Sequence, residues 1–195
     1  MTRTQADRKA DTRARLLDAA AELFGRDGFH ATSIDAVADA ADRTSGSVYA
    51  HFGGKPGLLE ALLDSWEGRT AREVADALQS ETLLEGRLAA LWEAVASPPD
   101  ERADAWMLLE HELWLYAART PDAAHALAAR YGAARTAMAA SFEGWGAGSG
   151  ALDQSQLATV TLALLFGLEM LHRADPCSVD DQLAPLALSA LFNAT

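Results

Sequence analysis

The chain has little cysteine, little proline and few β-branched runs, and each shortage narrows what it can be. A single cysteine, Cys177, among 195 residues rules out an intrachain disulfide and fits a reducing compartment. We expect Cys177 to be a small filler between helices. Only six prolines interrupt the long Ala- and Leu-rich stretches of a chain that is 50% hydrophobic. This composition favours an all-α fold.

A long uninterrupted apolar segment is also missing. The first residues, MTRTQADRKADTR, are polar and lack the apolar core of a signal peptide. The most apolar run, Leu157 to Leu168, carries two threonines and stops at Glu169, short of the ~20 residues that a membrane-spanning helix needs. We therefore expect a cytoplasmic protein that makes no membrane contact.

Positive charge is scarce, with 16 Lys and Arg against 28 Asp and Glu, or a net charge of −12. Because affinity for DNA comes largely from neutralising phosphates, this balance at first argues against DNA binding. The acidity is uneven, however: residues 1–60 carry 8 basic and 9 acidic side chains, and residues 61–195 carry 8 and 19. Residues 1–15 hold five basic side chains against two acidic ones. The N-terminal end could therefore contact a polyanion.

Complete catalytic and metal-binding motifs are absent as well. His111-Glu112 begins like the zinc-protease pattern HExxH, but Leu115 stands where the second His is needed. Gly148-Ser149-Gly150 lacks the spacing of a nucleophile elbow. No phosphate-binding loop and no paired-cysteine site is present. We expect no enzymatic activity, no metal and no cofactor.

What the chain does contain is a helix-turn-helix pattern between Thr32 and Lys55, TSIDAVADAADRTSGSVYAHFGGK. Ser33 is placed to cap a short helix whose apolar residues repeat at helical spacing. Asp42-Arg43 marks a turn, and a second short helix runs from about Thr44 to His51. That second helix carries small hydroxyl side chains and a glycine, so its backbone can approach DNA closely. The pattern predicts a reading helix for the major groove.

Glycine and proline divide the whole chain into nine predicted helices. Asp153 is a candidate N-cap for the eighth helix. Pro185 conflicts with a long last helix, because an interior proline costs ~3 kcal/mol. That helix therefore either begins near Ala184 or is kinked. The predicted helices cover residues 11–25, 34–41, 44–51, 55–80, 83–97, 101–119, 121–145, 153–173 and 179–193.

The run from Ala41 to Leu59, ADRTSGSVYAHFGGKPGLL, resembles the TetR family of bacterial one-component transcription regulators. The likeness is specific over roughly residues 11–66, and elsewhere it rests on helix number, length and the segment GLEMLHRADP. It implies a three-helix DNA-binding domain over residues 1–54 and a helical effector-binding and dimerisation domain over residues 55–195. The residues that match the family pattern are Gly46, Ser47, Tyr49, Phe52 and Lys55.

Three residues depart from that pattern. Asp42 replaces the usual turn glycine, but Asp tolerates a left-handed backbone, so the turn can survive. Arg43 replaces a small apolar residue; its stem can cover the core while its head points toward DNA, and whether it reads a base stays open. Ala50 stands where the family often has a bulky side chain, which reduces the contact surface.

The resemblance implies a role for each residue of the reading region. Tyr49 and Lys55 would each bind a phosphate, and Ser45, Ser47 and Arg43 are the candidates for base edges. Ser33 either caps its helix or also contacts DNA. His51 either binds phosphate or only packs between neighbouring helices. Arg8, Lys9 and Arg13 form either a mobile DNA-binding arm or a solvated tail. The expected DNA-binding set is Ser33, Arg43, Thr44, Ser45, Gly46, Ser47, Tyr49, His51 and Lys55.

Aromatic residues and methionine gather in the distal helices, where they form either plain core or an effector pocket. The pocket candidates are Trp92, Trp106, Met107, Glu110, His111, Trp114, Phe142, Trp145 and Phe166. In the family the last two helices pack on their copies as a four-helix bundle. The implied dimer contacts are Leu164, Gly167, Leu168, Leu171, Leu183, Leu186, Ala190 and Leu191.

These observations predict a homodimeric, ligand-responsive transcriptional repressor. Its partners would be a palindromic DNA operator, a small-molecule effector and a second copy of the chain. The alternative is a helical-bundle module that binds a ligand or a protein and carries a degenerate helix-turn-helix, as the acidity and Ala50 suggest. Salt-dependent binding to duplex DNA separates the two.

Overall fold

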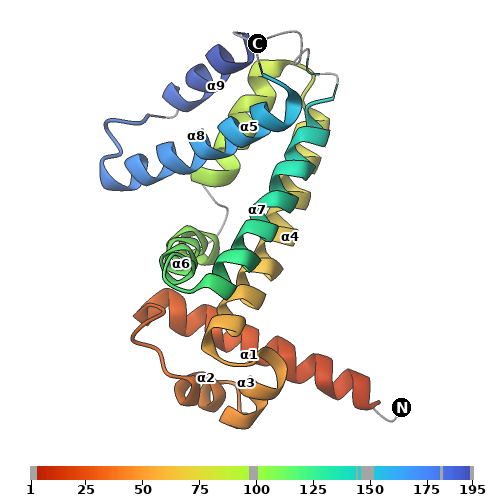
Figure 1. The fold of residues 1–195 in the computed structure, drawn as a ribbon, viewed down its shortest axis with the longest axis vertical. Coiled ribbons are helices and arrows are strands. Elements are labelled where there is room, and N and C mark those ends of the chain that lie inside the picture. The colour runs from red at the N-terminus through yellow and green to blue at the C-terminus, as the bar shows by residue number, and fades with distance from the viewer. Residues whose placement is uncertain (1–3, 97–100, 144, 146–151, 181, 194–195) are drawn as a thin grey trace. The chain divides into compact units, whose positions relative to one another are not determined.

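The computed structural model describes residues 4–96, 101–143, 145, 152–180 and 182–193, without the side chains of residues 67–74, 77, 79 and 101–106. The described residues form nine α-helices and no strand, which confirms the all-α prediction (Figure 1). The helices are α1 (Gln5–Asp27), α2 (Ile34–Ala40), α3 (Ser45–Phe52), α4 (Lys55–Ser80), α5 (Leu84–Ala96), α6 (Glu101–Ala117), α7 (Pro121–Ser141), α8 (Gln154–Ala174) and α9 (Leu183–Asn193).

The chain divides into two compact units, and the division falls within α4 and within α7. The first unit comprises Met1–Arg69 and Pro99–Ala123, and the second comprises Thr70–Pro98 and Ala124–Thr195. The first unit therefore contains α6 in addition to α1, α2 and α3. The boundary expected at residues 54 and 55 stays a prediction.

The core of the first unit forms where α1 meets α2, α3 and α6, and leucines near the start of α4 are buried as well. Apolar residues on one face of α1, among them Leu16, Ala20 and Phe24, are almost fully buried. The edge of the Phe29 ring packs on Phe24, with the ring centroids 5.4 Å apart. The Thr32 hydroxyl donates to the carbonyls of the α1 C-terminus, which fixes the loop that leads into α2. The two short helices are thereby anchored on α1.

Helix α1 begins at Gln5, six residues before the predicted start at Asp11. Thr4 and Asp7 form a capping box: the Thr4 hydroxyl accepts from the Asp7 amide at 3.1 Å, and the Asp7 carboxylate accepts from the Thr4 amide at 2.9 Å. These bonds also lower the pKa of Asp7. Arg8 and Lys9 thus lie on a helix together with Arg13, rather than in an arm or a tail that precedes it.

The second unit has its own core, which α5, α8, α9 and the end of α7 supply. Trp92, Phe142 and Phe192 are buried there among leucines. Asp153 caps α8 and forms a capping box with Gln156, as predicted for the N-cap. Helix α9 begins at Leu183, so Pro185 lies in the first turn, where no amide partner is needed. Of the two expectations for the last helix, the late start is confirmed.

Helix α8 has the length predicted for it and is apolar along most of that length. Its 21 residues and mean hydropathy of 1.3 make it the one described helix that could cross a membrane by length and composition. The core helix of a soluble protein meets the same criteria, so this finding is weak evidence for a membrane span. Within the unit, α8 packs on α5 and α9 and buries the charged residue Glu169, which contacts Arg173.

Cys177 is exposed in the loop between α8 and α9, so its assignment as a filler between helices is wrong. The Asp175 carboxylate accepts from the Cys177 amide at 3.1 Å and turns the chain there.

Candidate nucleic-acid interface

The helix-turn-helix is built from α2, a four-residue connection and α3. Ser33 caps α2, because its hydroxyl accepts from the Ala36 amide at 3.0 Å. Asp42 adopts a left-handed backbone with φ 55°, as expected for the residue in place of the family's glycine. The Arg43 amide then donates to the Ala38 carbonyl at 2.8 Å. The turn therefore closes without a glycine, and α3 starts in a fixed direction.

Helix α3 has one buried residue and a small, polar outer face. Val48 is fully buried in a helix that packs on α2 and α1, whereas Tyr49 is 58% exposed. Thr44 and Ser47 lie side by side, with their hydroxyl oxygens 3.1 Å apart. A Cβ added at Gly46 would meet nothing closer than the Thr44 hydroxyl at 3.7 Å, so packing does not require a glycine there. The exposed face is therefore free of bulk where a DNA-reading helix needs close approach.

Two of the expected base-reading residues are engaged within the protein. The Ser45 hydroxyl donates to the Asp35 carboxylate, which ties the start of α3 to α2. The Arg43 guanidinium bonds to the Asp11 carboxylate and the Thr12 hydroxyl, each at 3.2 Å. Its head therefore lies on α1, although the stem covers the core as expected. Sequence alone gave no signal for these contacts, because Arg43 and its α1 partners are about 30 positions apart.

The junction between α3 and α4 is shaped by three glycines. Gly53 and Gly54 have φ values of 74° and 139°, which L side chains rarely adopt. A Cβ on Gly57 would lie 2.0 Å from the Phe52 carbonyl oxygen, far inside contact distance. The end of α3 therefore touches the first turn of α4 directly. This contact fixes the position of Lys55, the first residue of α4.

Lys55 is folded onto the loop that follows α1. Its ammonium donates to the His30 carbonyl at 3.2 Å and lies 4.5 Å from the centroid of the Phe29 ring. Burial lowers the pKa of Lys55, and the nearby Glu112 carboxylate on α6 opposes that change. The same carboxylate lies 3.0 Å from the His30 ring nitrogen. The sequence had linked neither His30 nor Glu112 to the reading region.

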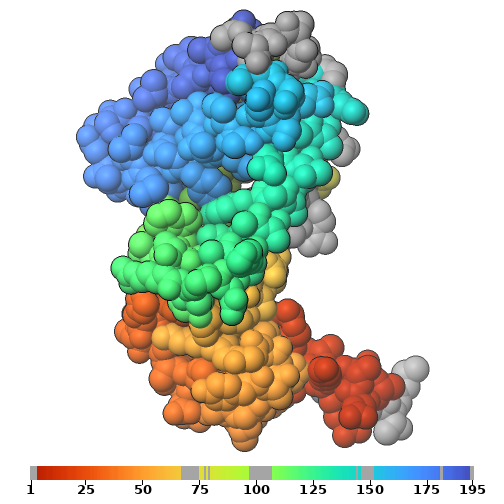
Figure 2. Space-filling view, viewed as in Figure 1, coloured from red at the N-terminus to blue at the C-terminus, as the bar shows by residue number. Residues whose placement is uncertain are grey.

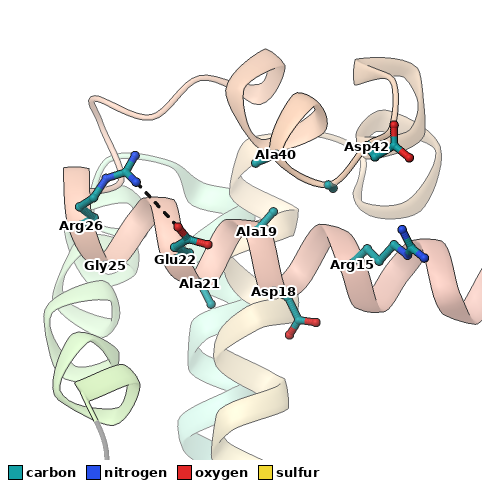
Figure 3. Close-up of a pocket in the computed structure, with 10 residues that line it drawn as sticks. Arg15, Asp18, Ala19, Ala21, Glu22, Gly25, Arg26, Ala40 and Asp42 are labelled. Atoms are coloured by element: carbon teal, nitrogen blue, oxygen red, sulfur yellow. Dashed lines mark ion pairs between the residues drawn. The ribbon is translucent and has the colours of Figure 1, made fainter.

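An open groove lies between α1 and the end of α2 (Figure 3). Its charged residues are Arg15 and Arg26 against Asp18, Glu22 and Asp42, and a dashed line marks the ion pair between Arg26 and Glu22. Two basic and three acidic side chains line the groove, so it offers no excess of positive charge to a phosphate. Among the described residues, no group of His, Cys, Asp and Glu could hold a metal ion.

The expected pocket residues fall in both units. In the first unit Met107 and Glu110 are buried, His111 is half-buried with its ring bonded to the Met107 carbonyl, and Trp114 is 53% exposed. The side chain of Trp106 lies outside the described residues. In the second unit the described candidates belong to aromatic packing: Trp92, Phe142 and Trp145 line the core, and Phe166 stacks edge-on against Tyr131. Their role as a pocket stays a prediction.

Helices α8 and α9 leave apolar residues facing outward. Leu171 is 57% exposed, Leu183 is 41% and Leu186 is 65%, and Gly167 and Ala190 are also exposed. The other expected dimer residues, Leu164, Leu168 and Leu191, are half-buried against the core of the second unit. Val160 and Met170 add further exposed apolar surface to α8 that the sequence interpretation missed.

Comparison with known proteins gives a consistent picture. A profile described as "Bacterial regulatory proteins, tetR family" matches residues 16–62. The HTH-type transcriptional repressor KstR2 of Rhodococcus jostii is 37% identical over 91 residues, which are 45% of each chain. The chain therefore spans less than half of KstR2. The HTH-type transcriptional regulator TtgW of Pseudomonas putida is 34% identical over 102 residues, 52% of this chain and 76% of TtgW.

A solved structure shares the fold over nearly the whole chain. It is that of a transcriptional regulator from Saccharomonospora viridis in complex with choline. The TM-score is 0.71 at 19% identity, and the match covers 94% of this chain and 96% of the other. At that identity the likeness establishes the arrangement of the helices alone.

Proposed function

Because the chain belongs to the TetR family of bacterial regulatory proteins, we propose that it is a ligand-responsive transcriptional repressor. It binds a roughly palindromic operator as a cytoplasmic homodimer, and a small-molecule effector releases it. The DNA-binding domain is residues 1–54, and the effector-binding and dimerisation domain is residues 55–195.

The outer face of α3 carries this proposal. Thr44, Gly46 and Tyr49 are exposed while Val48 anchors the helix from behind, so small donors and a bare backbone face outward. Such a surface suits the major groove, where hydroxyls reach base edges and phosphates. Tyr49 binds a phosphate through its hydroxyl, Ser47 reads a base edge, and Ser33 and Ser45 combine DNA contact with their internal bonds.

Dimerisation follows from the shortness of the reading helix. The eight residues of α3 cover only a half-site, so two copies must lie about 34–36 Å apart on one face of the DNA. The exposed leucines of α8 and α9 supply an apolar surface for a four-helix bundle with the partner. The same surface accounts for the apolar character of α8 without a membrane.

Effector control acts through the helices of residues 83–145. The regulator from Saccharomonospora viridis, whose fold this chain shares, was solved with choline, which supports a small-molecule site in a fold of this kind. Effector binding tilts α4, and the helix-turn-helix units of the two protomers then lose the spacing that the operator requires. Within the first unit, Glu112 of α6 contacts His30 and acts on Lys55, so a displaced α6 changes the charge around a phosphate-binding residue.

The test is fluorescence-anisotropy binding to the protein's own upstream DNA fragments across a salt series. The proposal requires tight, salt-steep binding to one palindromic fragment, and weaker binding after Tyr49→Phe or Lys55→Ala. Arg26→Gln is the matched control, because it removes a cation of α1 that is already paired with Glu22 and Asp27. Weak, sequence-blind binding at every salt concentration would instead support the degenerate helix-turn-helix. An effector found later must bind less well when operator is present.

A further inference from the structure

The basic residues at the start of α1 lie beside the reading helix. The Arg13 guanidinium carbon is 5.4 Å from the centroid of the Phe52 ring at the end of α3. Lys9 is one helical turn before Arg13 and therefore shares its face of α1. Both Lys9 and Arg13 act electrostatically on His51, in the last turn of α3. Three groups that can carry positive charge thus meet where α1 passes α3.

The acidic residues of this part of α1 are engaged elsewhere. Asp7 belongs to the N-terminal capping box, and Asp11 pairs with Arg43 and Arg15. No carboxylate within the described residues pairs with Lys9 or Arg13. Lys9 and Arg13 therefore repel each other across one helical turn.

The charged side chains of Asp35 and Lys55 near α3 are engaged away from Lys9, Arg13 and His51. Asp35 on α2 is bonded to Ser45 at the opposite end of α3. Lys55 on α4 lies against Phe29 and the His30 carbonyl. The first turns of α1, drawn in red, project from the body of the first unit (Figure 2). The basic cluster is thus open to a large anion such as a nucleic-acid backbone.

We propose that Lys9, Arg13 and His51 form an additional phosphate-binding site that clamps one phosphodiester of duplex DNA beside the reading helix. The site rests on the proposed DNA-binding function and extends it, because it adds α1 to the contacts expected from Tyr49 and Lys55. Stacking on Phe52 holds the Arg13 guanidinium in place, and Lys9 supplies a second positive charge.

Protonation of His51 belongs to the same site. Burial, and then the charges of Lys9 and Arg13, lower the pKa of His51 below 6.5 in the free protein. A bound phosphodiester would favour the charged imidazolium and raise that pKa. DNA binding would therefore take up a proton at His51, and affinity would rise as the pH falls from about 7.5 to about 5.5. The gain is at most about tenfold per pH unit for each bound protomer.

The first experiment measures the salt dependence of binding to a short duplex of mixed sequence, so the operator need not be known. Lys9→Gln and Arg13→Gln should each reduce the slope of log Kd against log salt by about 0.9 per protomer. Arg26→Gln, the control from the far end of α1, should leave the slope unchanged. Circular dichroism confirms that each variant is folded, and the exposed Lys9 makes a fold defect in that variant unexpected.

The second experiment follows the His51 ring by NMR, with His51→Gln to assign its signal. The His51 pKa should rise when DNA is added, and it should rise in free Lys9→Gln protein because a repelling charge is gone. In binding assays His51→Gln should flatten the pH dependence. Equal salt slopes in all variants, or a His51 pKa that DNA leaves unchanged, would overturn this site alone. Absence of any salt-dependent binding by the unmodified protein would overturn the proposed function as well.

Discussion

Arg43 allows the clearest separation between a structural role and a DNA-reading role. Its guanidinium bonds to Asp11 and Thr12 on α1 at 3.2 Å, and to the Asp42 carbonyl at 2.6 Å. The Arg43 and Asp11 side chains are 23% and 26% exposed, so water screens their interaction only in part. We predict that Arg43 tethers the turn of the helix-turn-helix to α1 and reads no base.

The size of the effect follows from this geometry. Hydrogen bonds to charged groups contribute about 1.5–3 kcal/mol when shielded, and exposed ion pairs about 0–1 kcal/mol. A partly exposed pair lies between them, so the coupling between Arg43 and Asp11 should be about 1–2 kcal/mol. For a chain of 195 residues this corresponds to a fall in Tm of roughly 2–8 °C.

The assay is a double-mutant cycle of Arg43→Gln and Asp11→Asn, followed by thermal unfolding and by operator binding. The cycle is needed because Asp11 also pairs with Arg15, at 3.3 Å. A tether predicts a lower Tm and a modest loss of affinity that is equal for every base substitution in the operator. A coupling energy near zero, with specificity lost at one base pair and stability unchanged, would refute the argument.

Three further predictions concern the reading helix and the surfaces around it. Gly46→Ala should leave the Tm unchanged, because the added Cβ has room in the protein, but it should weaken operator binding. Gly57→Ala should cost about 1–3 kcal/mol of stability, because its Cβ would clash with the Phe52 carbonyl. Thermal unfolding and fluorescence anisotropy distinguish the two variants. Glu112→Gln should raise operator affinity, because it removes a negative charge that acts on Lys55; unchanged affinity in a binding titration would disprove the link through α6. Leu186→Glu should yield folded monomers in sedimentation, while Leu83→Glu, at a similarly exposed leucine outside α8 and α9, should leave the dimer intact.

The local pattern of the chain was sufficient to predict the helix-turn-helix. Ser33 caps α2, Asp42 takes the left-handed turn, and Val48 is buried, because each depends on residues only a few positions away. The helix count and the late start of α9 were predictable for the same reason, since glycine, proline and capping residues act locally. The start of α1 was misjudged because the capping box of Thr4 and Asp7 was overlooked.

The sequence by itself determined which segments become helices, where they end and which short helix has a reading face, since hydrophobic spacing and caps act within one or two turns. Only the tertiary structure decided what the polar side chains do. Arg43 is held by α1, Lys55 lies near Glu112, and Lys9 and Arg13 lie beside His51. These partners are tens of residues apart in the chain, and their charges act on one another only because packing brings α1, α3, α4 and α6 together in the first unit.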